Sequence, residues 1–353
     1  MVSEAMTAPR HGGDGLGSDR SRLERLMQES IRISPAPGSR SPAWRASATL
    51  LVGLVALAGI GHIELAAYAC FGTFASIYGG RQPLRGRWRT QTAAGALMCA
   101  AVLCGGLVAT SPHRAWLVIP VAAVWAAAGS MLSDRFVLRP PGPMFPVFAV
   151  ATCAALPVTL SGVWVAVGVA AAAALVAVLL GLLEERLAGS GASVEASRGE
   201  VRLDHATAVV VAVVVAGTIS TALGLSHTYW AMVAAAVPFG VTGLLAQTTR
   251  GLQRVVGTLV GLVLAAVLLS VSLPALVVAV VVAALQGITE LLVGRHYGLA
   301  LVAITPLSLL MVQLGHPQPV DALLWSRLAE TLLGVVVGLA AALALREFRA
   351  SGR

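Results

Sequence analysis

The sequence predicts an all-α polytopic membrane protein with about twelve transmembrane helices, arranged as two parallel six-helix repeats. Composition is the first reason: 57% of the 353 residues are hydrophobic and only 11% are charged, whereas a soluble domain carries about a quarter charged residues. The second is that the apolar residues form runs of about 20, enough to cross about 30 Å of hydrocarbon. The third is that charged and glycine positions recur in the two halves. An ordinary soluble domain is therefore excluded.

Twelve apolar runs are predicted as spans. Pro146 and Pro157 bracket the fifth run, and prolines are accepted in membrane helices where neighbouring groups bind the freed carbonyls. In chain order the predicted spans cover residues 44–61, 63–80, 91–109, 115–132, 144–160, 162–183, 206–224, 228–246, 255–271, 274–293, 297–313 and 322–345.

These spans divide the chain into five parts. The first part is a mostly disordered tail in which Leu23, Leu26, Met27 and Ile31 share one face, as in an amphipathic helix that lies on a membrane surface. The connector between the halves is polar and mixed in charge. The parts are the tail (1–42), the first six-helix repeat (43–183), the connector (184–205), the second six-helix repeat (206–345) and a short end (346–353).

The arginines predict the orientation of the chain. All 24 basic residues are Arg, and 22 of them fall in segments that twelve spans place on one side; Arg114 and Arg327 are the exceptions. Positively charged loops stay in the cytoplasm, so both termini are predicted to be cytoplasmic. The positive charge is thus an orientation signal, and no nucleic-acid partner is expected. We expect a multi-pass protein in the lipid bilayer of a bacterial plasma membrane (the cell inner membrane).

An internal repeat supports the two-unit arrangement. At an offset of 165 residues the first half matches the second at Gly59, His62, Arg85, Gly86 and Arg89. At an offset of 156, a second block beginning at Asp134 matches the block beginning at Glu290. Because each unit has an even number of spans, the two copies are predicted to be parallel and to meet at one central interface, where transporters built from repeats bind substrate.

The second half also carries a distinctive set of motifs. They are Tyr229-Trp230-Ala231, then the stretch from Arg250 to Thr258, then the stretch from Glu290 to Ala300, and Thr305-Pro306-Leu307. In these motifs residues 205–345 resemble the fusaric acid resistance (FUSC) family of aromatic acid exporters, and residues 45–183 resemble a degenerate first copy. The chain has His296 and Glu330 where the family often has Asn and Asp, and no large cytoplasmic domain separates its halves.

The resemblance implies a secondary transporter that exports aromatic or other hydrophobic organic acids, small organic anions, driven by the proton gradient. No G-x-x-x-x-G-K-[ST] loop occurs, so ATP is not an expected partner. No cofactor, metal site or enzyme activity is expected, since the four cysteines lie in apolar runs without CxxC spacing. Two alternatives stay open: a passive organic-anion channel, and a structural or assembly membrane protein without transport activity. A homo-oligomer also stays open.

Two ionisable residues in the last span are candidates for the substrate and proton pathway. Arg327 and Glu330 are three residues apart, hence on one helix face and close enough to pair. They are either a structural ion pair or a site in which Arg327 attracts an organic anion and Glu330 responds to protonation. The second interpretation follows from the cost of placing a charge in hydrocarbon.

Further candidates lie near the outer face and in mid-span. His62 and His227 occupy equivalent hairpins, with Tyr229 just after the second, and histidine can sense protons near neutral pH or be merely solvated. Trp125 lies in mid-span, where its ring either stacks on an aromatic substrate or packs against lipid and helices.

The cytoplasmic side carries a repeated RGxxR pattern with nearby acidic residues. We expect either an electropositive vestibule that concentrates carboxylates before entry or a set of structural clamps in which the acids pair with the arginines. The candidates are Arg85, Arg89, Arg250, Arg254, Asp134, Arg139, Glu290, Arg295 and Tyr297. Two small-residue pairs, Gly257/Gly261 and Gly334/Gly338, have the spacing of close helix contacts.

Overall fold

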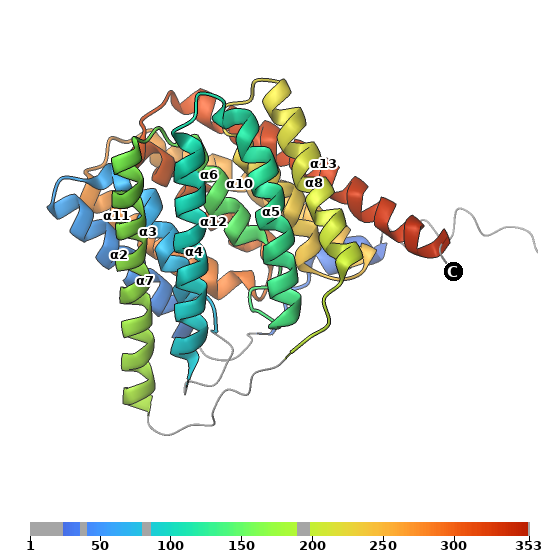
Figure 1. The fold of residues 1–353 in the computed structure, drawn as a ribbon, viewed down its shortest axis with the longest axis horizontal. Helices are drawn as coiled ribbons and strands as arrows, with labels where there is room; N and C mark the ends of the chain where they lie inside the picture. The colour runs from blue at the N-terminus through green and yellow to red at the C-terminus, as the bar shows by residue number, and fades with distance from the viewer. Residues whose placement is uncertain (1–23, 36–40, 80–85, 189–197, 352–353) are drawn as a thin grey trace, which may run out of the picture.

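The computed structural model describes residues 24–35, 41–79, 86–188 and 198–351, and within these ranges all regular structure is helical (Figure 1). Residues 24–31 form a short helix before the bundle. The first half contains α2 (Ser41–Gly59), η1 (Ile63–Leu65), α3 (Ala66–Thr73), η2 (Phe74–Ser76), α4 (Arg87–Ala109), α5 (Arg114–Arg135), α6 (Met144–Ala155) and α7 (Leu160–Ala188). The second half contains α8 (Leu203–Ala222), α9 (Thr228–Ala236), η3 (Val237–Gly240), α10 (Leu244–Leu269), α11 (Ala275–Val293), α12 (Tyr297–Gly315) and α13 (Val320–Ser351).

Eight of the described helices are long and apolar enough to cross a membrane by length and composition: α4, α5, α7, α8, α10, α11, α12 and α13. The protein is therefore a multi-pass membrane protein of helical type. Each of the twelve predicted runs falls on helical segments, but α2, α3 with its flanking turns, and α6 are shorter apolar helices.

One predicted boundary is wrong. The run at 228–246 was expected to be one span, followed by a span beginning at residue 255. Instead α9 ends at Ala236, a 3₁₀ turn through Pro238 follows, and α10 already begins at Leu244. The chain turns at Gly243, whose φ of +88° is open to glycine without steric cost. The polar residues after it are helical, and Gln247 and Arg254 point inward, so a hydropathy window excluded residues that tertiary packing buries.

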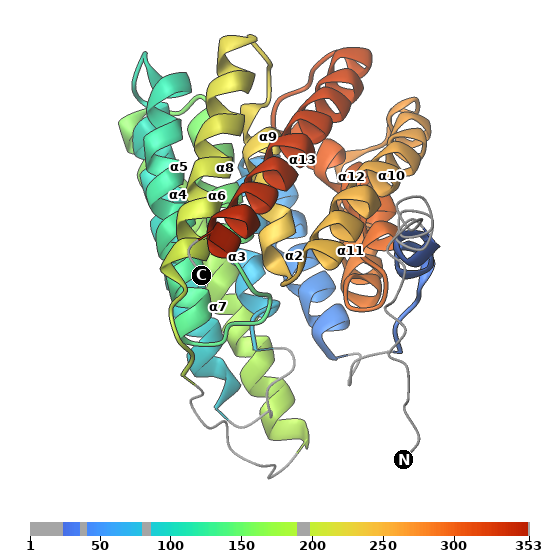
Figure 2. The same cartoon turned by 90° about the vertical axis from the view of Figure 1, so that its right-hand side faces the viewer.

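The two halves pack in matching ways. In the first half α4 contacts α6 and α7, as α10 contacts α12 and α13 in the second. Short α3 contacts α7, and short α9 contacts α13. The halves also contact each other reciprocally, since α2 packs against α11 and α5 packs against α8. Figure 2 shows α4, α5, α7 and α8 on one side and α10, α11 and α12 on the other, with α3 and α9 between them.

Small residues bring the second-half helices close together. Gly257 of α10 lies against the backbone of α12 at Gly298, and Gly334 of α13 lies against the α9 carbonyl of Ala231. A Cβ at either glycine would overlap with the facing backbone. The predicted contact role of the GxxxG pairs is thus confirmed for these two helix pairs.

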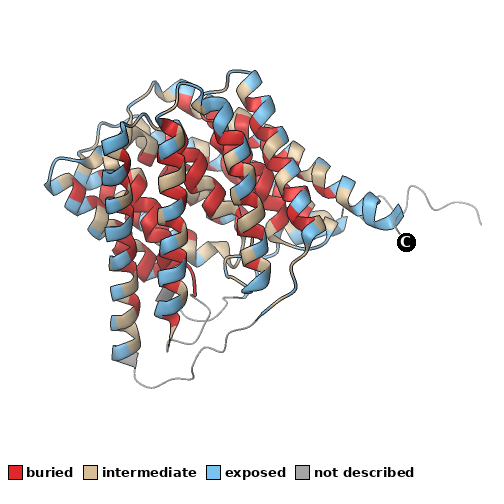
Figure 3. Ribbon diagram, viewed as in Figure 1, coloured by how far each residue is buried: buried red, intermediate tan, exposed pale blue. Residues whose placement is uncertain are grey.

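The outer surface of the bundle is apolar. Large hydrophobic side chains such as Trp164, Leu175, Val263 and Val336 are exposed on the long helices, while buried residues follow the inward faces (Figure 3). An exposed apolar surface of this extent is typical of a protein that contacts lipid.

Candidate functional site

A cavity of about 730 Å³ lies where the two halves meet. Its walls come from α3, α6 and the loop before α6 in the first half, and from α9 to α13 in the second. It follows α12 from Tyr297 at the first residue to His316 just beyond the last. A 19-residue helix is about 28 Å long, so the cavity extends along a length close to the thickness of a hydrocarbon core.

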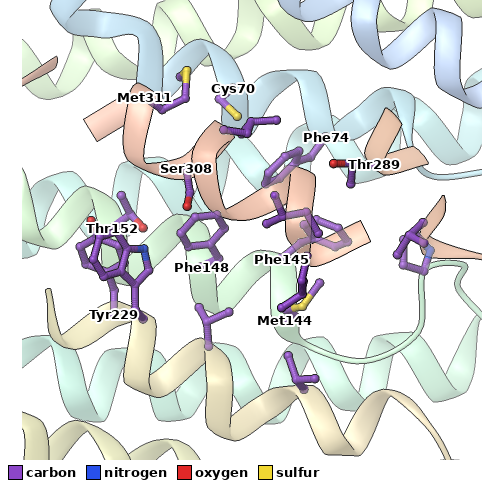
Figure 4. A pocket seen from close by; sticks show the side chains of 18 of the residues that line it. Cys70, Phe74, Met144, Phe145, Phe148, Thr152, Tyr229, Thr289, Ser308 and Met311 are labelled. Atoms are coloured by element: carbon purple, nitrogen blue, oxygen red, sulfur yellow. The ribbon is translucent and has the colours of Figure 1, made fainter. Parts of the chain in front are cut away.

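Aromatic side chains form much of the middle of this cavity. Phe71 contacts Phe148 edge-on with centroids 5.3 Å apart, and Phe74 contacts Phe145 at 4.7 Å. Phe148 then approaches Tyr229 of α9 at 6.3 Å, so the rings continue across the boundary between the halves (Figure 4). Such a surface favours flat apolar or aromatic groups.

Arg327 enters the cavity from α13. Its side chain is 3% exposed, and its guanidinium carbon lies 4.8 Å from the ring centre of Trp230. Among the described residues no hydrogen bond or ion pair reaches this guanidinium, and its Nε and the indole Nε1 of Trp230 are buried without a partner. Cation–π stacking therefore orients the charge, while its hydrogen-bond donors stay available.

Glu330 forms no ion pair with Arg327, so the first of the two alternatives, a structural ion pair, is not found in the structure. Its Oε1 accepts hydrogen bonds from the backbone N–H of His227 at 2.8 Å and from Ser326 Oγ at 3.1 Å. The side chain is fully buried, and Oε2 has no partner among the described residues. Although the two residues share one helix face, Glu330 accepts from the His227 N–H of the loop before α9 and from Ser326 of α13, while the guanidinium of Arg327 stacks on the Trp230 ring.

The two histidines are in unlike surroundings. His227 is buried, stacks on Trp230 with centroids 4.6 Å apart, and lines the cavity. Its Nδ1 is hydrogen-bonded to Ser326 Oγ at 2.9 Å, which joins it to Glu330. His62 is exposed and does not line the cavity, and its Nδ1 is hydrogen-bonded to Glu64 at 2.9 Å. His62 therefore fits the alternative of a solvated histidine, and of the two only His227 lies at the cavity.

A second cationic cluster lies where α10 and α12 begin. The guanidinium carbon of Arg250 lies 4.5 Å from the ring centre of Tyr297, and Arg254 Nη1 donates to the Tyr297 hydroxyl at 2.9 Å. Arg254 is 3% exposed, and its Nε has no partner. Neither arginine forms an ion pair with a described residue, and all three side chains line the cavity.

The predicted vestibule is only partly assembled. Arg139, Glu290 and Arg295 line the cavity together with the Tyr297 cluster. Of the two acids expected to form ion pairs, Asp134 pairs with Arg202 at 2.8 Å, away from the cavity. Glu290 accepts a hydrogen bond from Gln286 at 3.2 Å and has no arginine partner within 4 Å among the described residues.

The other first-half candidates do not reach the cavity. Arg89 is exposed beside Trp88, and Trp125 packs half-buried against the apolar core. Arg85 lies outside the described residues.

Sequence reasoning missed a buried charge cluster in the first half. Arg45 of α2 is fully buried, contacts Glu184 of α7, and donates to the carbonyl of Ser76 at 2.9 Å. Arg87 of α4 donates to the same Glu184 at 3.1 Å. The sequence did contain a signal for this cluster, because Arg45 is a charged residue at the start of an apolar run. These arginines have an acidic partner inside the protein, unlike those of the cavity.

The N-terminal segment is attached near the Tyr297 cluster. The carbonyl of Ser30 accepts hydrogen bonds from His296 Nε2 at 2.7 Å and from Gln253 Nε2 at 3.1 Å, and Ser34 N–H donates to the Arg295 carbonyl at 3.0 Å. His296 also caps α12, because its Nδ1 accepts from the Leu299 N–H at 3.1 Å. This segment, together with α10 and α12, encloses a smaller hollow beside Arg250.

The long apolar helices define the class of protein: a polytopic helical membrane protein with a cavity where its two halves meet. Residues 202–341 match the family model for fusaric acid resistance protein-like proteins, which confirms the resemblance shown by the motifs over this part of the chain. Comparison with curated proteins and with solved structures gave no match.

Proposed function

We propose that this protein is a secondary transporter that exports aromatic or other hydrophobic organic acids through the central cavity, driven by the proton gradient. The observation that carries this proposal is Arg327, a buried cation without an anionic partner among the described residues, beside a wall of aromatic rings. An unpaired buried charge costs several kcal/mol. A bound carboxylate would offset that cost, while its apolar body would contact the rings.

The paired packing supports an arrangement of two six-helix repeats. The reciprocal contacts of α2 with α11 and of α5 with α8 are what duplication of one unit predicts. Under this arrangement α3 and α9 are equivalent short helices, and both contribute to the cavity wall. Alternating access by movement of one unit against the other would then open the cavity to each side in turn. The arginine distribution favours cytoplasmic termini in a bacterial membrane.

Glu330 is the candidate proton carrier. Its Oε1 is held by two donors, so a proton would be carried by the buried and unpartnered Oε2. Protonation would remove a negative charge close to Arg327 and change how strongly the cavity attracts an anion. Proton binding at Glu330 and substrate binding at Arg327 would therefore influence each other, because the two residues lie one helical turn apart on α13.

Transport by purified protein in liposomes tests the proposal. Radiolabelled benzoate should accumulate against its gradient when a pH gradient is imposed, and Arg327→Gln should abolish this accumulation. Arg202→Gln is the matched control, because Arg202 pairs with Asp134 outside the cavity. Uptake that only equilibrates would support the channel alternative. A folded wild-type protein without flux of any tested aromatic acid would refute the transport function.

A further inference from the structure

The charge on the cavity wall is strongly unbalanced. Its lining contains five arginines and one carboxylate, that of Glu290. Three of the five, Arg139, Arg250 and Arg295, are at least partly open to solvent, where water and salt screen them. The other two, Arg254 and Arg327, are buried. Of the nearby described carboxylates, Glu290 is partly open to solvent and hydrogen-bonded to Gln286, and Glu330, one turn from Arg327, is bound by His227 and Ser326. The cavity therefore holds two buried guanidiniums without a direct acidic partner among the described residues.

The two buried arginines of the cavity wall both have a hydrogen-bond donor without a partner. Arg254 and Arg327 are each 3% exposed, and the Nε of each is buried without a partner. Arg254 contacts a phenol hydroxyl and Arg327 an indole ring, neither of which carries a negative charge. Guanidinium groups stay protonated in proteins. Each therefore provides a place for an acidic group.

Elsewhere the described part of the chain neutralises its buried arginines internally. Arg45 and Arg87 share Glu184, so the first half needs no external anion for them. The contrast shows that unpaired arginines are not a general feature of this bundle. They are concentrated on the wall of one cavity, at two places: Tyr297 where α12 begins, and Trp230 on α9.

We propose that the cavity selects an organic dianion: a flat apolar or aromatic body with two separate acidic groups. One acidic group binds at Arg254 beside Tyr297, and the other binds at Arg327 beside the indole N–H of Trp230. A monoanion leaves one deep guanidinium uncompensated, whereas a dianion compensates both. This inference rests on the proposed function and specifies its substrate class.

A pair of competitors that differ by one charge tests the inference in proteoliposomes. Terephthalate carries two carboxylates on one ring, and monomethyl terephthalate has the same ring with one carboxylate. Against radiolabelled benzoate uptake at pH 7.5, terephthalate should inhibit at about tenfold lower concentration than the monoester, since a hydrogen bond to a charged group contributes about 1.5–3 kcal/mol. The ratio should fall close to one in Arg254→Gln and stay unchanged in Arg202→Gln. In Arg327→Gln, which is expected not to accumulate benzoate, the same ratio is measured as thermal stabilisation of the detergent-solubilised variant by the two compounds, and it should also fall close to one.

The outcomes separate the two proposals. Equal inhibition by the two compounds in a wild-type protein that transports benzoate would overturn the dianion proposal and leave the transport function standing. Absence of uptake and of binding for all three acids would refute the transport function itself. Thermal stabilisation of the detergent-solubilised wild type by each acid gives a second measurement that needs no variant, and terephthalate should again be effective at about tenfold lower concentration.

Discussion

The guanidinium of Arg327 stacks on Trp230 at 4.8 Å, while Glu330, one turn further along α13, is bound by the backbone of His227. One helix face thus holds a cation directed into the cavity and a carboxylate directed into the protein. This separation leaves the cation available for a ligand, and it underlies the first two predictions.

Replacing Arg327 by Met should stabilise the empty protein and abolish transport. Met fills similar apolar volume without an uncompensated buried charge, so the free energy of unfolding should rise by about 1–3 kcal/mol without substrate. Thermal unfolding in detergent and benzoate uptake measure the two effects. Arg45→Met is the control and should lower the unfolding temperature, because Arg45 has an acidic partner in Glu184. Equal destabilisation by both variants would show that Arg327 is structural.

Replacing Glu330 by Gln should uncouple transport from the proton gradient. The amide oxygen of Gln still accepts from His227 N–H and Ser326 Oγ, so the loop before α9 should keep its position. Downhill benzoate flux should persist, while the accumulation ratio under an imposed pH gradient falls to about one. Accumulation equal to that of the wild type would mean that another group carries the proton.

Replacing Gly334 by Ala adds one methyl group and should disrupt the contact between α13 and α9 that positions Arg327. A Cβ there would overlap with the Ala231 carbonyl of α9, which directly follows Trp230. Gly334→Ala should lower the free energy of unfolding by about 1–3 kcal/mol and reduce benzoate uptake. Gly168→Ala is the control on α7, where a Cβ meets nothing within 4 Å, and it should be neutral or stabilising by up to about 1 kcal/mol. Similar losses in both variants would argue against a specific α9–α13 contact.

Replacing His296 by Asn should separate two roles of this residue. Asn is a good helix N-cap, so α12 should keep its first turn, but its shorter side chain cannot keep the hydrogen bond to the Ser30 carbonyl. Amide hydrogen exchange over residues 24–35 should become faster, with exchange in α12 unchanged. His296→Ala should also accelerate exchange at the start of α12. Unchanged exchange over residues 24–35 in both variants would show that this contact does not hold the segment.

Much of the candidate site was accessible from the sequence because ionisable residues stand out in an apolar chain. Arg327 was selected by that criterion, His227 and Tyr229 by their place in the repeated hairpin, and Arg250 and Arg254 by the repeated RGxxR spacing. All five line the cavity. Glu330 was selected as well and lies beside the cavity, bonded to His227. The partners of these residues were not accessible. Helical spacing indicated an Arg327–Glu330 pair, yet residues from α9 and the loop before it bind both groups.

The internal repeat indicated the two-unit arrangement, but it was misleading about the roles of single residues. It suggested equal roles for His62 and His227, and for Arg89 and Arg254. In each pair only the second-half member is buried at the cavity. Equivalent positions had the same residue type, but the surrounding helices give them different burial.

The sequence by itself determined the class of the protein, the places of its apolar helices and its family resemblance. It could do so because the free energy of transferring a segment into hydrocarbon is a sum of contributions from consecutive residues. That sum can be calculated from the residues of the segment alone. Only the tertiary structure decided which arginines are neutralised and which are left for a ligand. Arg87 is paired by Glu184, 97 residues away along the chain, whereas no described carboxylate reaches Arg327. Whether a buried arginine is neutralised depends on its distance to a carboxylate on another helix. The sequence of one helix does not give that distance.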